Sequence, residues 1–301
     1  MSVIYWTSDG AGAGVGDIPS LLNRWIVAQR DATLIINGGD VYNTGTDANY
    51  ALFAQQMGND FSLICQTSGN HDWMTRTQSP QTGLIPAGYE AFWRAHAPPA
   101  SKQPIDTTKK GGARYEHFMD VDGWRLIFLD TGYCETSAWP GDDAGRTQWL
   151  RQALRAPPDR AKIVFAHHSR LSYGAHGDNP GVEAIWQELF DSGGAPLVAC
   201  TIAGHDHNVS LYGPRPRTNP EAGSVPFAQG VYVTVNGAGG AGFYAADAGT
   251  KPDLLFDDES FCVTRVRLDS AQTARIDLLG FGALPNAQTV PQVLGGITIE
   301  L

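Results

Sequence analysis

Apolar and polar segments alternate along the first half of the chain in a way that predicts strands and helices in turn. Apolar runs typical of buried strands occur at 3–8, 34–37 and 61–66. Between them, apolar residues recur at helical spacing at Leu21, Leu22, Trp25 and Ile26 and again near 50–57. Because a helix between two strands is the usual crossover of a parallel pair, this order predicts a mainly parallel inner sheet.

The second half of the chain is expected to add antiparallel strands. Asp122-Gly123 separates two apolar runs and predicts a hairpin of strands at 115–120 and 124–130. Further strands are expected at 163–166, 197–203, 231–236, 261–268 and 273–279, and further helices near 147–154 and 182–192. Residues 98–113 are rich in Pro, Lys, Thr and Gly, so we expect an exposed loop there.

The length of the chain and the lack of repeats predict a single domain. At 301 residues the chain can bury a sizeable core, and no linker divides it. We expect one catalytic domain over 1–284 and a C-terminal tail, 285–301. The tail either packs on the domain or adds a strand to a neighbour.

Composition narrows the range of partners. Hydrophobic residues make up 42% of the chain and charged residues 17%, which is ordinary for a globular protein. The net charge is −10 and most basic residues are scattered, so the sequence offers no grip for nucleic acid. No apolar stretch is long enough to span a membrane, and no membrane partner is expected. Nothing in the sequence indicates the oligomeric state.

The cysteines favour a reducing compartment. The four thiols are far apart in the sequence, and three of them, Cys65, Cys200 and Cys262, lie in apolar runs, whereas Cys134 does not. We therefore expect free, buried thiols. No charged and apolar leader precedes the first strand, which favours a cytoplasmic protein, or an exported one if the sequence was trimmed.

Polar residues directly follow five of the expected strands. They are Asp9, Asp40, Asn70-His71-Asp72, His167-His168 and His205-Asp206-His207. In open α/β sheets, functional sites gather at the carboxyl ends of the strands. Asp, Asn and His are poor core material, so packing alone explains this pattern badly.

The donor types at these strand ends predict a metal centre. Carboxylates, one amide oxygen and imidazoles without thiolates suit cations such as Mn, Fe, Zn or Co. There are more donors than one metal needs, and two metals sharing one carboxylate is the simplest solution. Because two-metal sites stabilise both the attacking and the leaving oxygen of an in-line displacement, phosphate ester hydrolysis is the predicted chemistry.

Taken in order, these motifs resemble those of the calcineurin-like metallophosphoesterases. Within that superfamily the chain is most similar to the purple acid phosphatase branch, because His176 lies in the segment 172–177 after His167 and Gly237-Ala238-Gly239-Gly240 follows a late strand. The resemblance implies an α/β fold, a four-layer α/β/β/α sandwich of two mixed β-sheets flanked by helices. It also implies two metal ions, Fe, Mn or Zn, between loops at the edge of the sheets.

The resemblance also implies a role for each matching residue. The first metal would be held by Asp9, Asp40 and His207, and the second by Asp40, Asn70, His167 and His205. Asp40 would therefore bridge the two ions. His71 and His176 match the two histidines that face the substrate in this branch.

Several of these positions have a second interpretation. His176 fits an exposed loop histidine nearly as well. Asp72 can orient His71 by accepting a ring hydrogen bond, and His168 or Asp206 can support the ligands from behind. Each of these three residues fits an ordinary turn equally well.

The chain departs from the family pattern beside the first metal. Many members carry a histidine two residues after the first aspartate, where this chain has Ala11. Purple acid phosphatases have a tyrosine three residues after the bridging aspartate, whereas Tyr42 comes two residues after Asp40. If Tyr42 is a ligand, Fe(III) and a coloured centre are favoured. If Tyr42 packs beneath the loop instead, two divalent ions are favoured.

The glycine-rich stretch at 7–17 does not complete a nucleotide-binding motif. A dinucleotide fingerprint requires Gly-x-Gly-x-x-Gly, and the third glycine is missing in both possible registers. No Walker lysine follows. Asp9 is therefore the expected chemical residue of this stretch, and no cofactor-binding residues beyond the metal ligands are predicted.

The predicted function is the hydrolysis of phosphate monoesters on small phosphorylated substrates, by attack of a metal-bound hydroxide. The nearest alternative keeps the same site but cleaves diesters such as nucleotides or phospholipid head groups. The sequence does not choose between them, because loops build the pocket. A further alternative is a catalytically silent module that binds metal or ligand, favoured only by the histidine missing after Asp9.

Overall fold

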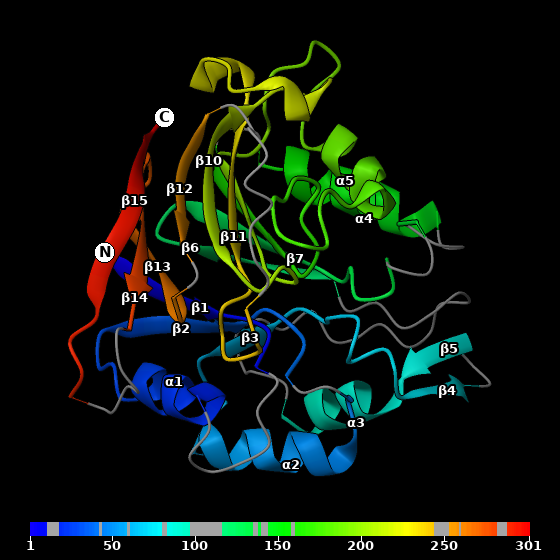
Figure 1. Ribbon diagram of the computed structural model, residues 1–301. Helices are drawn as coiled ribbons and strands as arrows, with labels where there is room; N and C mark the ends of the chain where they lie inside the picture. The colour runs from blue at the N-terminus through cyan, green and yellow to red at the C-terminus, as the bar shows by residue number, and fades with distance from the viewer. Residues whose placement is uncertain are drawn as a thin grey trace.

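The structure is a computed structural model of the chain. It describes residues 1–10, 18–41, 44–58, 61–79, 83–96, 116–134, 138–139, 144–157, 160–243, 253–258, 260–281 and 288–301. Two β-sheets pack face to face and carry helices on their outer faces (Figure 1). In the described part of the chain, no helix is long and apolar enough to cross a membrane.

The first sheet has six strands and contains the N-terminal strand near its centre. In spatial order they are β15 (Gln292–Glu300), β14 (Thr273–Gly280), β13 (Cys262–Ser270), β1 (Ser2–Thr7), β2 (Ala32–Asn37) and β3 (Ile64–Gln66). The β1, β2 and β3 strands are parallel, as the alternation of strands and helices predicted. The other three strands are antiparallel to their neighbours.

The second sheet has seven strands. In spatial order they are β12 (Leu254–Asp258), β10 (Val209–Arg215), β11 (Val231–Asn236), β9 (Cys200–Ala203), β8 (Ala161–Ala166), β7 (Trp124–Leu129) and β6 (His117–Val121). Four adjacent strands, β7, β8, β9 and β11, are parallel. The hairpin between β6 and β7 turns at Asp122 and Gly123, whose φ angles of 47° and 85° give the left-handed turn that follows the twist of the strands.

Alternate side chains of β1 pack into two different hydrophobic cores, one on each face of the strand. Ile4 and Trp6 point into the layer between the sheets, where they pack with residues of the second sheet such as Phe128 and Phe165. Val3 and Tyr5 face the other way and pack under helices. Because successive side chains of a strand point to opposite faces, a run in which every residue is apolar predicts a strand buried on both faces.

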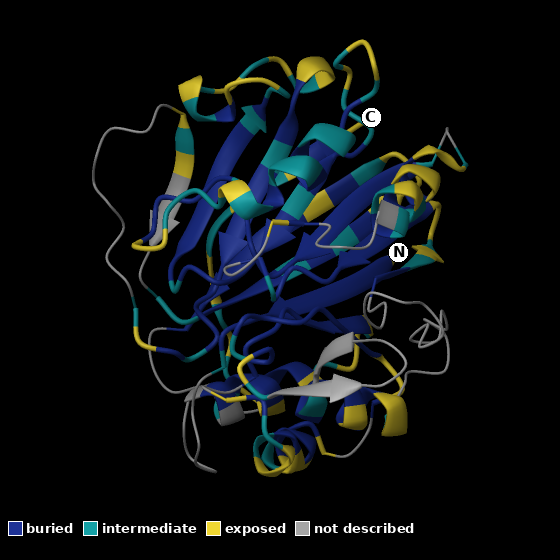
Figure 2. Ribbon diagram, turned by 90° about the vertical axis from the view of Figure 1, so that its right-hand side faces the viewer, coloured by how far each residue is buried: buried dark blue, intermediate teal, exposed yellow. Residues whose placement is uncertain are grey.

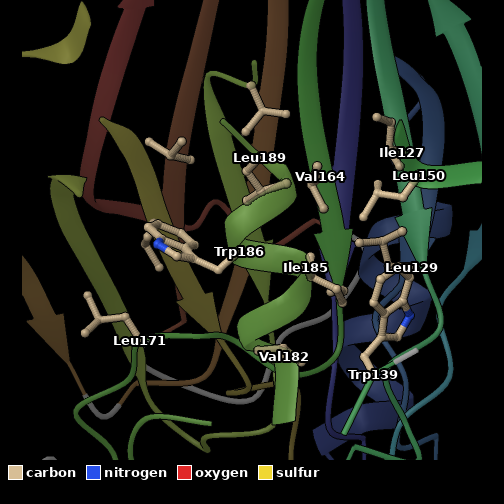
Figure 3. Packing of buried hydrophobic residues seen from close by; sticks show 14 of the residues in the cluster. Ile127, Leu129, Trp139, Leu150, Val164, Leu171, Val182, Ile185, Trp186 and Leu189 are labelled. Atoms are coloured by element: carbon tan, nitrogen blue, oxygen red, sulfur yellow. The ribbon is translucent and has the colours of Figure 1, made fainter. Parts of the chain in front are cut away.

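Helices cover the outer face of each sheet. Three helices, α1 (Ile18–Val27), α2 (Asp47–Gln56) and α3 (Ala87–Ala95), pack on the six-stranded sheet. Two others, α4 (Ala144–Arg155) and α5 (Glu183–Glu188), pack on the seven-stranded sheet, where Leu150, Ile185 and Trp186 meet Ile127 and Val164 (Figure 3). Most of the inner strands are dark blue in Figure 2, because both faces of these strands are covered, whereas the edge strand β15 carries exposed residues. The four-layer α/β/β/α sandwich is therefore as predicted.

Several elements were not predicted from the pattern. They are α3, β10, β12, β15 and the small two-stranded sheet of β4 (Arg76–Ser79) and β5 (Gly83–Pro86), together with three short 3₁₀ helices at Pro180–Val182, Pro220–Ala222 and Phe227–Gln229. The expected exposed loop at 98–113 lies outside the described residues. Part of the predicted tail forms β15, the edge strand beside β14. All four cysteines are free and buried, as predicted.

Candidate metal centre

Five strand ends, three from one sheet and two from the other, bring their polar side chains together. Asp9, Asp40 and Asn70 follow β1, β2 and β3 of the six-stranded sheet, whereas His167 and His205 follow β8 and β9 of the seven-stranded sheet. All five are buried, with 0–8% of each residue exposed. Because parallel strands end at a common edge, the predicted residues converge where the two edges meet.

The first part of the cluster is built around the side-chain oxygen of Asn70. Its Oδ1 lies 3.0 Å from Nε2 of His167 and 3.1 Å from Nδ1 of His205. Nε2 of His167 is also 3.3 Å from Oδ2 of Asp40. Two imidazoles, an amide oxygen and a carboxylate thus face one point.

The second part of the cluster is built around Asp9. Its Oδ1 lies 3.8 Å from Nε2 of His167 and 3.7 Å from Nε2 of His207. Asp9, Asp40 and His167 each offer a ligand atom within 4.8 Å of the others. Among the described residues, Oδ1 of Asp9 is buried and has no hydrogen-bond partner. Because a buried carboxylate oxygen is costly without a partner, this orphaned atom and the donors around it fit a cation.

The backbone holds three of these residues in an unusual conformation. Asp9, Asp40 and His205 have φ angles of 59°, 52° and 71°, in the left-handed region that costs a non-glycine residue free energy. The surrounding hydrogen bonds over-determine these turns. The amide of His205 donates to Oδ2 of Asp9 at 2.9 Å, and the amide of His71 donates to Oδ1 of Asp40 at 2.8 Å.

Two glycines allow the loops to approach this closely. A Cβ atom on Gly69 would lie 2.0 Å from Oδ1 of Asp40, and one on Gly204 would lie 2.6 Å from Oδ2 of Asp9. Both glycines are therefore required to leave room for the carboxylates themselves. Their position explains why Gly precedes Asn70 and His205 in the sequence.

The electrostatics of the cluster favour bound positive charge. Burial opposes the charged form of His167, yet the carboxylates of Asp40 and Asp9 outweigh burial and raise the pKa of His167 to about 10. Burial raises the pKa of Asp9, and the attraction to His167 offsets this only in part. Burial lowers the pKa of His205 and His207, which keeps both imidazoles neutral and their lone pairs available. The two carboxylates therefore attract a cation, and the neutral imidazoles can ligate one.

Asp72 does not take the place expected for it. Its Oδ1 accepts from the hydroxyl of Tyr50 at 2.6 Å, and its Oδ2 accepts from the amides of Asp40 and Gly69 at 3.0 and 2.8 Å. None of the hydrogen bonds of this carboxylate, as described, runs to the ring of His71. The expected pairing is thus wrong, because the fully buried carboxylate is used to tie the loop of Asp40 to the loop of residues 69–72.

The two predicted substrate-facing histidines do border the centre. Nε2 of His71 is 3.9 Å from Oδ2 of Asp40, and 32% of the His71 side chain is exposed. The ring of His176, an exposed residue, stacks on that of His205 with centroids 4.2 Å apart and planes at 28°. Beside His176 lies an open cavity of about 390 Å³, lined by Cys134, His205 and residues 176–181. Of the two imidazoles, that of His176 therefore lines this cavity.

Of the remaining residues singled out in the sequence, His168 lies near the centre, and two others lie outside the described residues. His168 is buried behind the centre, its ring 4.2 Å from that of His205, and it offers a ligand atom within 4.8 Å of those of His167 and His205. Tyr42 and Ala11 lie outside the described residues.

A buried ionic network near the centre was not predicted from the sequence. Arg146 of α4 lies between Glu116 and Asp130, with N–O distances of 3.3 and 3.5 Å. Asp130 also accepts hydrogen bonds from the hydroxyl of Ser68 and from the indole of Trp73. The network thereby anchors the loop that presents Asn70 and His71. Charged residues far apart in a sequence give no indication that they will form a buried ion pair.

Comparison with known proteins identifies the family. The family model described as calcineurin-like phosphoesterase matches residues 11–209, more than half of the chain. The chain therefore belongs to the calcineurin-like phosphoesterase family, as its motifs predicted.

Two curated relatives have names that state an activity. A 3',5'-cyclic adenosine monophosphate phosphodiesterase, CpdA, of Pseudomonas aeruginosa is 25% identical over 58% of this chain and 54% of its own length. A glycerophosphodiester phosphodiesterase, GpdQ, of Enterobacter lignolyticus is 25% identical over 66% of this chain and 63% of its own. The chain thus spans less than two thirds of the length of either relative.

Solved structures share the fold across the chain. A purple acid phosphatase, PPD1, from yellow lupin seeds superimposes with a TM-score of 0.72 at 15% identity, covering 99% of this chain and 53% of that protein. PhoD gives a TM-score of 0.70 at 11% identity, covering 99% and 69%. GAP50, the anchor in the inner membrane complex of Plasmodium, gives 0.63 at 16% identity, covering 100% and 89%. The predicted similarity to purple acid phosphatases is confirmed for the fold.

Proposed function

We propose that this protein is a metal-dependent hydrolase of phosphoric esters. The observation that carries the proposal is the convergence of carboxylate, amide and imidazole donors from five strand ends at one point. The orphaned Oδ1 of Asp9 and the attraction of the carboxylates for positive charge support bound cations there. Membership of the calcineurin-like phosphoesterase family supports the reaction class.

Two cations fit the donor set. One would be held by Asp9, Asp40 and His207, and the other by Asp40, Asn70, His167 and His205, with Asp40 shared. Oxygen and nitrogen donors of this kind suit Mn, Fe or Zn. When bound, the cations supply Lewis acidity that polarises the phosphate and acidifies water.

The chain's own residues bind and orient the ester. His71 and His176 border the cluster from two sides, so each can donate a hydrogen bond from its ring to a phosphoryl oxygen. Either ring, when protonated, can also give a proton to the departing alkoxide. The buried hydrogen bonds that Asp72 accepts from the amides of Asp40 and Gly69 tie the loops together, so that little reorganisation accompanies the reaction.

Phosphate monoesters are the substrate class that we propose first. A monoester carries one more negative charge than a diester near neutral pH, and two imidazoles beside the cations can hold two of its oxygens. The second candidate is a phosphodiesterase, which the names of the two curated relatives favour. The leaving group of either ester would occupy the cavity lined by Cys134, His205 and residues 176–181.

The test compares turnover of p-nitrophenyl phosphate and bis-p-nitrophenyl phosphate by protein loaded with Mn, Fe or Zn. A strong preference for the monoester is expected, and a strong preference for the diester would instead support the second candidate. Asp40→Ala is expected to abolish both activities, whereas Asp269→Ala, which removes an exposed carboxylate, should leave them unchanged. Bound metal without turnover of any phosphate ester would refute the proposal and favour a silent binding module.

A further inference from the structure

The carboxylate of Asp206 connects the metal cluster to a loop that comes from another part of the chain. Asp206 stands between two of the proposed ligands, His205 and His207, and only 1% of it is exposed. Its side chain belongs to neither group of potential ligand atoms among the described residues. Instead, its Oδ1 accepts a hydrogen bond of 2.9 Å from the backbone amide of His176.

The 172–178 loop is shaped to rest on this carboxylate. A Cβ atom at Gly174 would lie 2.3 Å from Oδ1 of Asp206, so only glycine lets the loop come this close. The start of the loop is held separately, by the hydrogen bond of 3.1 Å from the amide of Tyr173 to the hydroxyl of Tyr212. Asp206 therefore holds the middle of the loop, where His176 lies.

His176 needs this anchor because its side chain is on the surface. Burial alone does not restrict an exposed histidine, so ordering its backbone and rotamer costs conformational entropy. The bond to Asp206 fixes the backbone from which the ring reaches His205, where the two rings stack at 4.2 Å. The ring is thereby held at the edge of the centre before any substrate arrives, which is the arrangement that favours reaction.

We propose that Asp206 is a positioning residue, which clamps the 172–178 loop and places His176 against the metal cluster. The inference rests on the proposed function for its catalytic consequence, although the clamp itself does not depend on it. It assigns Asp206 to the loop that faces the substrate, whereas the sequence had suggested support of the ligands or a simple turn. The same loop forms one wall of the 390 Å³ cavity, so the clamp also shapes the space for the leaving group.

A double-mutant cycle tests this role in metal-loaded protein. His176→Ala and Asp206→Ala are each expected to lower kcat/KM by roughly 10- to 100-fold, the range that a displaced acid or hydrogen-bond donor costs. The variant with both changes is expected to be no slower than His176→Ala alone, because Asp206 acts through His176. Two reductions that multiply would overturn the inference. Asp206→Asn keeps an oxygen acceptor and is expected to restore most of the activity.

Two further measurements separate the clamp from other effects. Metal content is measured on every variant, and loss of metal from Asp206→Ala would overturn the inference in favour of ligand support. Amide hydrogen exchange of the 172–178 segment is expected to accelerate in Asp206→Ala and to stay slow in His176→Ala. Unchanged exchange in Asp206→Ala would show that there is no clamp. The exchange result stands even if no phosphate ester is hydrolysed, an outcome that refutes the proposed function instead.

Discussion

Replacing Arg146 with methionine is predicted to destabilise the protein by several kcal/mol. The Arg146 guanidinium lies 3.3 Å from Glu116 and 3.5 Å from Asp130, and the three side chains are 4%, 1% and 0% exposed. Methionine fills similar space but leaves two buried carboxylates without their cation. Removing one partner of a buried ion pair costs about 3–5 kcal/mol. The melting temperature is therefore expected to fall by roughly 10 °C.

The same substitution at Arg151 provides a matched control. Arg151 lies on the same helix and pairs with Glu188 at 2.6 Å, but its side chain is 55% exposed. An exposed pair contributes only about 0–1 kcal/mol. Thermal and urea unfolding of both variants, followed by circular dichroism, gives the comparison. If Arg146→Met unfolds within about 1 kcal/mol of Arg151→Met, the assignment of a buried ionic network is refuted.

The effect of pH gives a second check on the same variant. Burial already raises the pKa of Asp130, and Arg146 opposes that rise. Without the guanidinium the folded-state pKa of Asp130 rises further. A carboxyl group with a raised folded-state pKa destabilises the fold as pH increases from its unfolded value through its folded value. The deficit of Arg146→Met is therefore expected to grow as pH rises above the ordinary pKa of an aspartate, about 4, and a deficit that shrinks would argue against this assignment.

Two other predictions concern the centre itself. Gly69→Ala is expected to abolish metal binding, measured by elemental analysis, because its Cβ would lie 2.0 Å from Oδ1 of Asp40; full metal content would contradict this. Metal binding is expected to release protons and to tighten as pH rises, because the pKa of His167 is raised to about 10 in the metal-free protein and Asp9 is raised as well. Calorimetry at pH 7 in buffers of different ionisation enthalpy should detect this release, and identical heats would argue against it.

The strand ends were predictable because each follows an apolar run that is buried on both faces. Asp9, Asp40 and Asn70 each come shortly after such a run, and their convergence needs only the parallel order of the strands. Strands that contain turn-forming residues were harder to predict from the pattern of apolar residues. β10 includes Gly213 and Pro214, which are typical of turns, and β15 carries two glycines, so their pairing partners decide their conformation.

The supporting residues of the centre could not be predicted in the same way. A carboxylate after a strand can accept a hydrogen bond from a histidine ring, bind a metal or accept from a backbone amide. Only the fold shows that Asp72 accepts from the hydroxyl of Tyr50 and from two backbone amides. Arg146 and Asp130 look like surface residues in a sequence because their pairing depends on contacts between distant elements. The sequence leaves Asp206 open between support of the ligands and an ordinary turn, and only the fold shows the amide of His176 donating to it.

We propose that Asp40 links two cations at a centre that hydrolyses phosphate esters. The most direct test measures metal stoichiometry and turnover of p-nitrophenyl phosphate on the same samples of wild-type protein and Asp40→Ala. We predict two metal ions per chain in the wild type, fewer in the variant, and a loss of turnover of roughly 10³-fold or more, with the melting transition retained. Full turnover by Asp40→Ala would contradict the account.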